Sequence, residues 1–139
     1  MRIGVDVMGG DYAPGPILEG ALQATTQLES DDVVVLYGDK AVIDAAVSNF
    51  EGAVASIEVV GTTEVVSMDE SPVDAVRTKQ DSSLVVMCKD GSAKAEAPLD
   101  AVISAGNTGA FVAGSQMHLR RLTGVHRPGI AAAVPTFAG

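Results

Sequence analysis

Cysteine, tryptophan and basic residues are scarce in this 139-residue sequence. Cys88 is the single cysteine, which excludes an internal disulfide framework and a cysteine-rich zinc site. No tryptophan occurs, and aromatic residues make up only 4% of the chain. Nine Lys and Arg residues against 18 Asp and Glu residues give a net charge of −9. This balance argues against a polyanion-binding surface over the whole protein, and so against generic nucleic-acid binding.

Long hydrophobic runs and metal-ligand patterns are also missing. The longest aliphatic runs, such as residues 33–37, are far shorter than the roughly 20 residues that a membrane-spanning helix needs. Asp6 interrupts the apolar N-terminal segment, which is not typical of a signal peptide. His118 and His126 have no cysteine or paired acid at metal-ligand spacing. We therefore expect a cytoplasmic protein without a metal site.

Apolar segments alternate between strand-like and helix-like patterns along the whole chain. Small and aliphatic residues dominate, as is typical of helices packed on a parallel sheet. Strands are predicted at residues 2–7, 33–37, 57–60, 100–104 and 130–134. The continuous β-branched run 33–37 predicts a strand that is buried on both faces. Helices are predicted at residues 16–28, after a cap at Asp39, at 73–79 after a cap at Ser71, at 84–89 after a cap within residues 81–83, and at 110–122. The order predicts one α/β domain over residues 1–139, with a mainly parallel sheet, right-handed crossovers and helices on both faces.

Two glycine-rich segments directly follow predicted strands, at residues 8–11 and 105–109. Ligands of open α/β sheets bind at the carboxyl ends of strands. Glycine lets backbone N–H groups approach a ligand, and the next helix adds unpaired donors and partial positive charge. Both segments are therefore candidate anion sites, where Asn107 and Thr108 could add side-chain donors. The alternative is that the glycines only form tight turns.

Neither glycine segment fits a nucleotide-binding motif, because no Gly-x-Gly-x-x-Gly or P-loop pattern is present. Acidic residues lie beside the first segment. For Asp6 we favour a structural role, in which the carboxylate accepts hydrogen bonds from loop N–H groups. For Asp11, that role and a catalytic or cation-positioning role both stay open.

Two further polar clusters are candidates for binding. Residues 77–83 place Lys79 before Ser82 and Ser83, so a positive charge and hydroxyl groups could meet a phosphate. The alternative is a solvated helix end with a serine cap. The basic residues around positions 120–127 could contact an acidic partner or complement the dipole at a helix C-terminus. Cys88 lies in an apolar stretch and is expected to be a buried packing residue.

Four segments together resemble the PlsX family, the phosphate acyltransferases of bacterial phospholipid synthesis. They are IGVDVMGGDYAP at 3–14, SPVDAVRTKQDSS at 71–83, ISAGNTGA at 103–110 and RPGIAAAVPT at 127–136, in the order typical of the family. The resemblance implies a three-layer α/β/α sandwich similar to isocitrate and isopropylmalate dehydrogenases. Members of the family are longer, and a parallel strand is normally followed by a crossover. Residues 1–139 are therefore expected to be the N-terminal portion of a longer enzyme.

The resemblance also implies an activity: transfer of a fatty acyl group from acyl carrier protein to inorganic phosphate, which yields an acyl phosphate. The resemblance implies no cofactor. It implies a homodimer that associates peripherally with the membrane. One alternative is transfer of a short acyl group between coenzyme A and phosphate. Another is a truncated domain that binds phosphate or a partner without turnover.

These considerations assign candidate site residues. Phosphate is expected against the turn at residues 106–109, with Lys79 nearby and with Asn107 or a backbone N–H serving the developing oxyanion. Asn107 and Lys79 are the predicted catalytic residues. The predicted substrate-binding residues are Gly9, Gly10, Asp11, Ser82, Ser83, Ser104, Gly106, Thr108 and Gly109. The predicted contacts with the acidic carrier protein are Arg120, Arg121 and Arg127.

Overall fold

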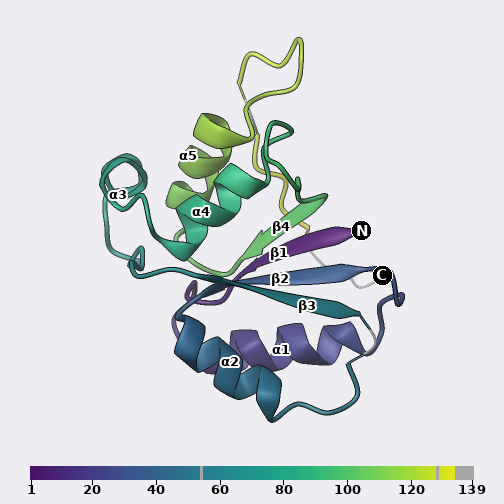
Figure 1. Ribbon diagram of the computed structural model, residues 1–139. Coiled ribbons are helices and arrows are strands. Elements are labelled where there is room, and N and C mark those ends of the chain that lie inside the picture. Colours follow the sequence, from purple (N-terminus) through teal and green to yellow (C-terminus); the bar gives the residue numbers. More distant parts are fainter. Residues whose placement is uncertain (54, 128, 134–139) are drawn as a thin grey trace, which may run out of the picture.

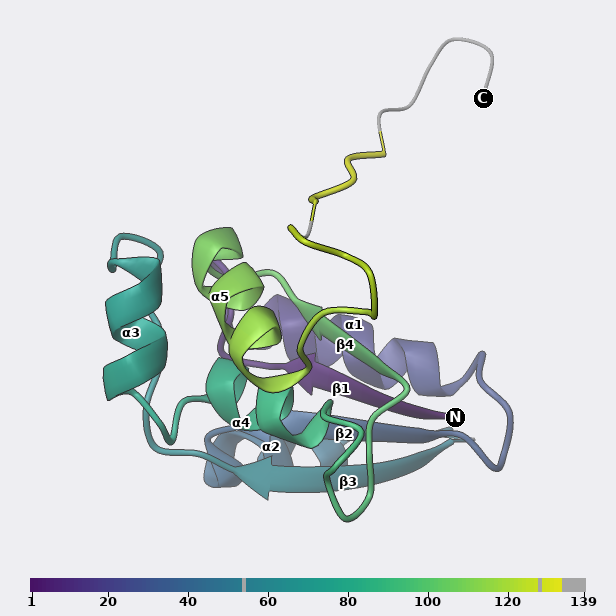
Figure 2. The same ribbon diagram turned by 90° about the horizontal axis from the view of Figure 1, so that it is seen from above.

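A parallel sheet of four strands forms the middle layer of the protein, and helices cover both of its faces (Figures 1 and 2). The computed structural model describes residues 1–53, 55–127 and 129–133. Along the chain the elements are β1 (Arg2–Asp6), α1 (Gly15–Thr25), β2 (Val33–Gly38), α2 (Lys40–Ser48), β3 (Ser56–Gly61), α3 (Pro72–Thr78), α4 (Ser83–Asp90), β4 (Ala101–Ser104) and α5 (Thr108–His118). The sheet order is β3-β2-β1-β4, and every pairing is parallel. The predicted α/β class is confirmed.

Strand β2 shows how the hydrophobic pattern produces the layers. Its residues are β-branched or bulky, which suits a strand that is covered on both faces. Val34 and Leu36 pack toward α1 and α2, whereas Val35 and Tyr37 pack with Met87 of α4. The side chains alternate because successive residues of a strand point to opposite faces. The prediction of a strand buried on both faces is therefore confirmed.

A second core lies between α3, α4 and α5, on the same side of the sheet as α4 (Figure 1). Val76, Leu84 and Ala110 are buried there together with Cys88. Burial raises the pKa of the Cys88 thiol to about 11, so the group is a neutral packing residue at neutral pH. The expected packing role of Cys88 is confirmed.

Helix starts agree with the sequence only in part. Asp39 caps α2 as expected, because its side chain accepts hydrogen bonds from the N–H groups of Ala41 and Val42. Ser71 and Ser82 precede α3 and α4 but make no capping bond. Their hydroxyls donate to the Asp74 carboxylate and to the carbonyl of Lys79 instead, so the predicted serine caps are wrong.

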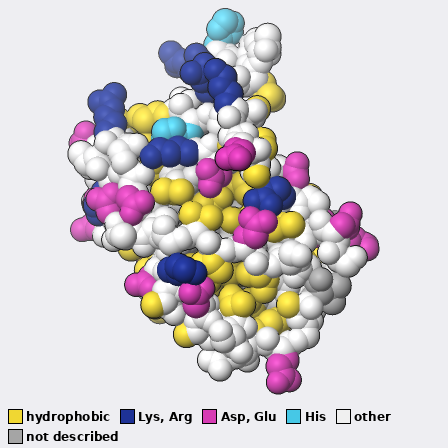
Figure 3. Space-filling model, in the orientation of Figure 1, with side chains coloured by type: hydrophobic (Ala, Val, Ile, Leu, Met, Phe, Trp, Pro, Cys, Tyr) yellow, Lys and Arg dark blue, Asp and Glu magenta, His cyan; other side chains and the backbone are white. Residues whose placement is uncertain are grey.

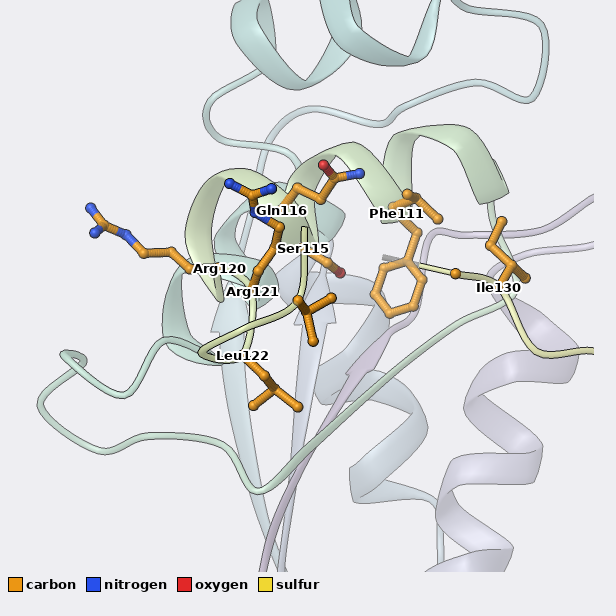
Figure 4. Close-up of a pocket in the computed structure, with 10 residues that line it drawn as sticks. Phe111, Ser115, Gln116, Arg120, Arg121, Leu122 and Ile130 are labelled. Atoms are coloured by element: carbon orange, nitrogen blue, oxygen red, sulfur yellow. The ribbon is translucent and has the colours of Figure 1, made fainter. Parts of the chain in front are cut away.

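The fifth predicted strand does not form in the described part of its range. Residues 130–133 have no strand structure, and Val134 lies outside the described residues. A strand needs a hydrogen-bonded neighbour, whereas Ile130 lies beside α5 and lines a cavity with Phe111 (Figure 4). Helix α5 also ends at His118, earlier than the predicted residue 122.

Candidate functional site at the carboxyl ends of β1 and β4

Strand β1 is the point at which the order of the strands in the sheet reverses. Strands β2 and β3 lie on one side of it and β4 lies on the other. The chain leaves β1 toward α1 and leaves β4 toward α5, and these two helices cover opposite faces (Figure 1). Ligands of such sheets bind at the carboxyl ends of the strands on either side of this point. The candidate site is this region, and the name β1–β4 crevice is used below for the loops after β1 and β4 together with the start of α5.

The two glycine segments meet in the β1–β4 crevice. Asp6 and Ser104 are paired in register, so both strands end at the same level. A Cβ on Gly9 would lie 2.9 Å from the backbone nitrogen of Gly106 and 2.5 Å from Oδ2 of Asp6. A Cβ on Gly106 would lie 3.1 Å from the Cα of Gly9. Glycine at both positions therefore permits the close approach of the two loops, as the tight-turn alternative requires.

A buried carboxylate joins the two loops. Asp6 is 2% exposed; its Oδ1 accepts a hydrogen bond from the N–H of Met8 at 3.2 Å. Its Oδ2 accepts from the Ser104 hydroxyl at 2.7 Å, and that hydroxyl oxygen accepts from the N–H of Gly106 at 3.1 Å. The structural role expected for Asp6 is confirmed. Ser104 is part of this hydrogen-bonded chain, and its role in substrate binding stays a prediction.

Asn107 fastens the start of α5 to the loop before α3. Its Oδ1 accepts from the N–H of Ala110 at 3.0 Å, which caps the helix. Its Nδ2 donates to the carbonyl oxygens of Ser67, Met68 and Glu70 at 3.1–3.2 Å. The side-chain amide is thus fully engaged. The predicted oxyanion role requires Nδ2 to exchange one of these carbonyls for substrate.

Lys79 holds the same loop from the other side. Its ammonium lies 2.5 Å from Oε1 of Glu70 and 2.7 Å from the carbonyl oxygen of Val65. The ion pair with Lys79 lowers the pKa of the Glu70 carboxyl below its usual range. Sequence reasoning missed Glu70, because a separation of nine residues marks no pattern. To serve phosphate as predicted, Lys79 must share its charge with Glu70.

Backbone donors remain open at the start of α5. Among the described residues, the N–H groups of Thr108 and Gly109 donate no hydrogen bond. They are the orphan donors of the first helical turn, where the helix dipole is positive. Packing also favours glycine at position 109, because a Cβ there would lie 2.6 Å from Cγ of Pro72. The crevice therefore offers an anion two free backbone donors on an exposed turn.

The remaining predicted substrate-binding residues differ in accessibility. Ser82 and Ser83 are 0% and 2% exposed, so they are closed to a ligand in this conformation. Asp11 is exposed, and Gly10 has a φ of 125° that favours glycine. A Cβ on Gly10 would lie 3.4 Å from the carbonyl oxygen of Ala105 in the β4 loop. Gly10 thus lies against the loop after β4, whereas Ser82 and Ser83 are buried at the junction between α3 and α4.

The predicted partner-binding arginines lie beyond α5. All three are exposed, and Arg120 and Arg121 line a cavity of about 380 Å³ along the outer side of α5 (Figure 4). The Arg121 guanidinium donates to the carbonyl oxygen of His126, while Arg127 lies at the surface nearby. Basic side chains gather at this end of the molecule (Figure 3). Their role in partner binding stays a prediction.

A family model described as "Fatty acid synthesis protein" matches residues 1–139. The chain belongs to this family. The phosphate acyltransferase of Heliobacterium modesticaldum is 41% identical over 143 residues, which cover 100% of this chain and 40% of the relative. That of Clostridioides difficile is 41% identical over 97% of this chain and 38% of the relative. The resemblance to PlsX is confirmed.

The chain spans about 40% of the length of the curated relatives that it matches. Within the described ranges, no helix is long and apolar enough to cross a membrane. Nor do three or more metal-ligating side chains come together in the part of the chain that the structure describes.

Proposed function

We propose that the protein transfers a fatty acyl group from acyl carrier protein to inorganic phosphate and releases an acyl phosphate. One observation carries the proposal: the Gly9 and Gly106 loops meet beside β1, where the strand order reverses, and the exposed start of α5 follows directly on the second loop. The printed names of the relatives, phosphate acyltransferases, support this class of reaction.

The proposed step needs little acid–base chemistry. A phosphate oxygen attacks the thioester carbonyl carbon, and a C–O bond forms while the carbonyl oxygen becomes an oxyanion. The oxyanion collapses, the C–S bond breaks, and the thiolate leaves and takes a proton from water. Phosphate is already anionic and nucleophilic at neutral pH, so the enzyme contributes mainly positioning and charge stabilisation.

The residues of the crevice can divide these tasks. Phosphate binds against residues 106–109, where the N–H groups of Thr108 and Gly109 are free to donate. Gly9 and Gly10 bring a second backbone to the same place. Asn107 and Lys79 act from the wall of the site, through the loop that both residues hold and through contact with the oxyanion or phosphate.

The proposed partners follow from charge and from the resemblance. The exposed Arg120, Arg121 and Arg127 form the contact surface for the acidic carrier protein. A cytoplasmic homodimer with peripheral membrane association completes the proposal, on the resemblance alone.

The test is a phosphate-dependent acyl-transfer assay of the complete protein with acyl carrier protein and coenzyme A thioesters as alternative donors. Formation of acyl phosphate with a clear preference for the carrier-protein donor supports the proposal. Preference for short coenzyme A thioesters would replace it with the alternative donor. If calorimetry detects phosphate binding but no donor is turned over, the protein binds phosphate without catalysing transfer.

A further inference from the structure

Residues 67–70 form a tight turn in the loop between β3 and α3, here named the 67–70 turn. The N–H of Ser67 donates to Oε1 of Glu70 at 2.7 Å, and the N–H of Glu70 donates to the carbonyl oxygen of Ser67 at 3.4 Å. Val66, directly before the turn, is buried in the core between α3, α4 and α5, and α3 begins at Pro72. The turn is therefore closed on itself and anchored at both ends, so it can shift without disturbing the core.

Two side chains from outside hold the 67–70 turn in place. Nδ2 of Asn107 donates to the carbonyl oxygens of Ser67, Met68 and Glu70 at 3.1–3.2 Å. An amide nitrogen carries two hydrogens, so three acceptors share two donors and at least one of these bonds is weak. The Lys79 ammonium lies 2.5 Å from Oε1 of Glu70. The two donors that the proposed function assigns to substrate are thus engaged by one turn.

Glu70 occupies the position of an anion on Lys79. The hydrogen bond from Lys79 lowers the pKa of the Glu70 carboxyl, so the group is a carboxylate at neutral pH. The two side chains are 30% and 28% exposed, which leaves the ion pair in contact with solvent. Phosphate carries more negative charge and more acceptor oxygens than a carboxylate. Phosphate is therefore a suitable replacement for Glu70 as the partner of Lys79.

The free backbone donors of α5 lie next to this ion pair. The N–H groups of Thr108 and Gly109 are open, and a Cβ on Gly109 would lie 2.6 Å from Cγ of Pro72, two residues after Glu70. An anion at the start of α5 is thus attracted by Lys79 and repelled by Glu70. The resting position of Glu70 and a bound phosphate oppose each other.

We propose that Glu70 is an internal competitor of phosphate: its carboxylate holds Lys79 in the substrate-free protein, and phosphate displaces it and releases the 67–70 turn. The inference rests on the proposed function, which places phosphate at residues 106–109 near Lys79. Displacement frees Lys79 for phosphate, and it frees Nδ2 of Asn107 for the oxyanion as the carbonyls of the turn move away.

Competition has a consequence that a supporting role of Glu70 does not have. Part of the binding free energy of phosphate is used to displace the carboxylate, which weakens the observed affinity. Removing the competitor should therefore strengthen phosphate binding, although it removes a stabilising ion pair. If Glu70 only supported the loop around the site, its removal would weaken phosphate binding or leave it unchanged.

The first test is calorimetric titration of the complete protein with inorganic phosphate in the absence of an acyl donor. Glu70→Gln keeps the size of the side chain and removes its charge, and it should lower Kd for phosphate about 3- to 10-fold. Glu70→Asp keeps the charge but draws the carboxylate away from Lys79, so it should lower Kd by a smaller factor. A Kd that is unchanged or raised in both variants would overturn the competition.

Asp69→Asn is the matched control for charge. Asp69 is the exposed neighbour of Glu70 in the same turn, whereas the contact with Lys79 belongs to Glu70. Both substitutions to the amide remove one negative charge from the turn. Asp69→Asn should change Kd by less than about 2-fold, because an exposed charge is screened by solvent and salt. If Asp69→Asn gains as much affinity as Glu70→Gln, general electrostatics accounts for the effect and the competition is overturned.

The second test follows the turn by amide hydrogen exchange. The N–H of Ser67 is bonded to the Glu70 carboxylate, so saturating phosphate should speed exchange in residues 67–70 of the unaltered protein. In Glu70→Gln, exchange should already be fast without phosphate. Residues 40–48 of α2 should exchange alike in every variant, which checks that the fold is intact. Slower exchange of the turn on addition of phosphate would contradict its release.

Acyl transfer is measured in parallel and separates this inference from the proposed function. If phosphate binds with the expected pattern but no donor yields acyl phosphate, the proposed function fails and the competition stands. If acyl phosphate forms while Glu70→Gln and Asp69→Asn bind phosphate alike, the function stands and the competition fails. If the complete protein binds no phosphate, both fail.

Discussion

The side-chain nitrogen of Asn107 lies 3.1 Å from the carbonyl oxygen of Glu70, which ties the glycine turn after β4 to the loop before α3. The carboxylate of the same Glu70 is paired with Lys79. The two residues predicted to be catalytic therefore hold one loop from opposite sides. Changes at either residue should alter the position of this loop as well as any direct contact with substrate.

Asn107→Ala should reduce both stability and phosphate-dependent turnover. It removes the cap of α5, which costs about 0.5–2 kcal/mol of unfolding free energy, and it releases the carbonyls of the loop. Asn107→Asp keeps the capping oxygen but turns an acceptor toward those carbonyls, so it should recover helix capping and not turnover. Urea unfolding and kcat/KM for phosphate measure the two effects. Wild-type turnover in Asn107→Asp would exclude a function for Nδ2.

The ion pair between Glu70 and Lys79 should stabilise the protein only above the acid range. Lys79 lowers the pKa of Glu70 in the folded state, so its stabilising effect is present above the unfolded pKa of about 4.3. It is lost as the pH falls through the folded pKa. The difference in unfolding free energy between the unaltered protein and Glu70→Gln should therefore shrink between pH 6 and pH 3. A difference that is constant over this range would contradict the assignment.

Gly106→Ala should separate the two loops of the candidate site. The new Cβ would lie 3.1 Å from the Cα of Gly9, and because the obstacle is backbone, overpacking should cost about 1–3 kcal/mol. Gly20→Ala is the control, since nothing lies within 4 Å of a Cβ there and alanine favours the α1 helix by about 0.5–1 kcal/mol. Thermal unfolding of both variants checks the prediction. Equal stability of the two variants would show that the loops can part without cost.

Charge reversal at Arg120 and Arg127 should weaken the use of the carrier-protein donor. These exposed arginines attract an acidic partner, so the variant Arg120→Glu/Arg127→Glu should raise KM for acyl carrier protein. The same variant should make this KM less dependent on salt concentration. KM for phosphate should not change. Lys94→Glu, which alters charge on an exposed loop, is the control. If both kinds of variant act alike, the effect comes from net charge rather than from a contact surface.

The sequence by itself determined the elements whose signals are local. The apolar run 33–37 predicts a doubly buried strand, and Asp39 predicts a helix cap; both are observed. Glycines after two strands predict two loops at one end of a parallel sheet, which the structure confirms. Such features depend on backbone preferences and on hydrophobic period, which neighbouring residues encode.

Tertiary structure decided which groups stay free in these loops. Asn107 and Lys79 find carbonyl and carboxylate partners 9 to 40 residues away in sequence, and Ser82 is buried instead of open to a ligand. Among the described residues, the hydroxyl of Thr62 is buried without a hydrogen-bond partner. Residues 130–133 form no strand, although the sequence predicts one at 130–134. Partner choice depends on how distant loops pack, and no local pattern of residues carries that information.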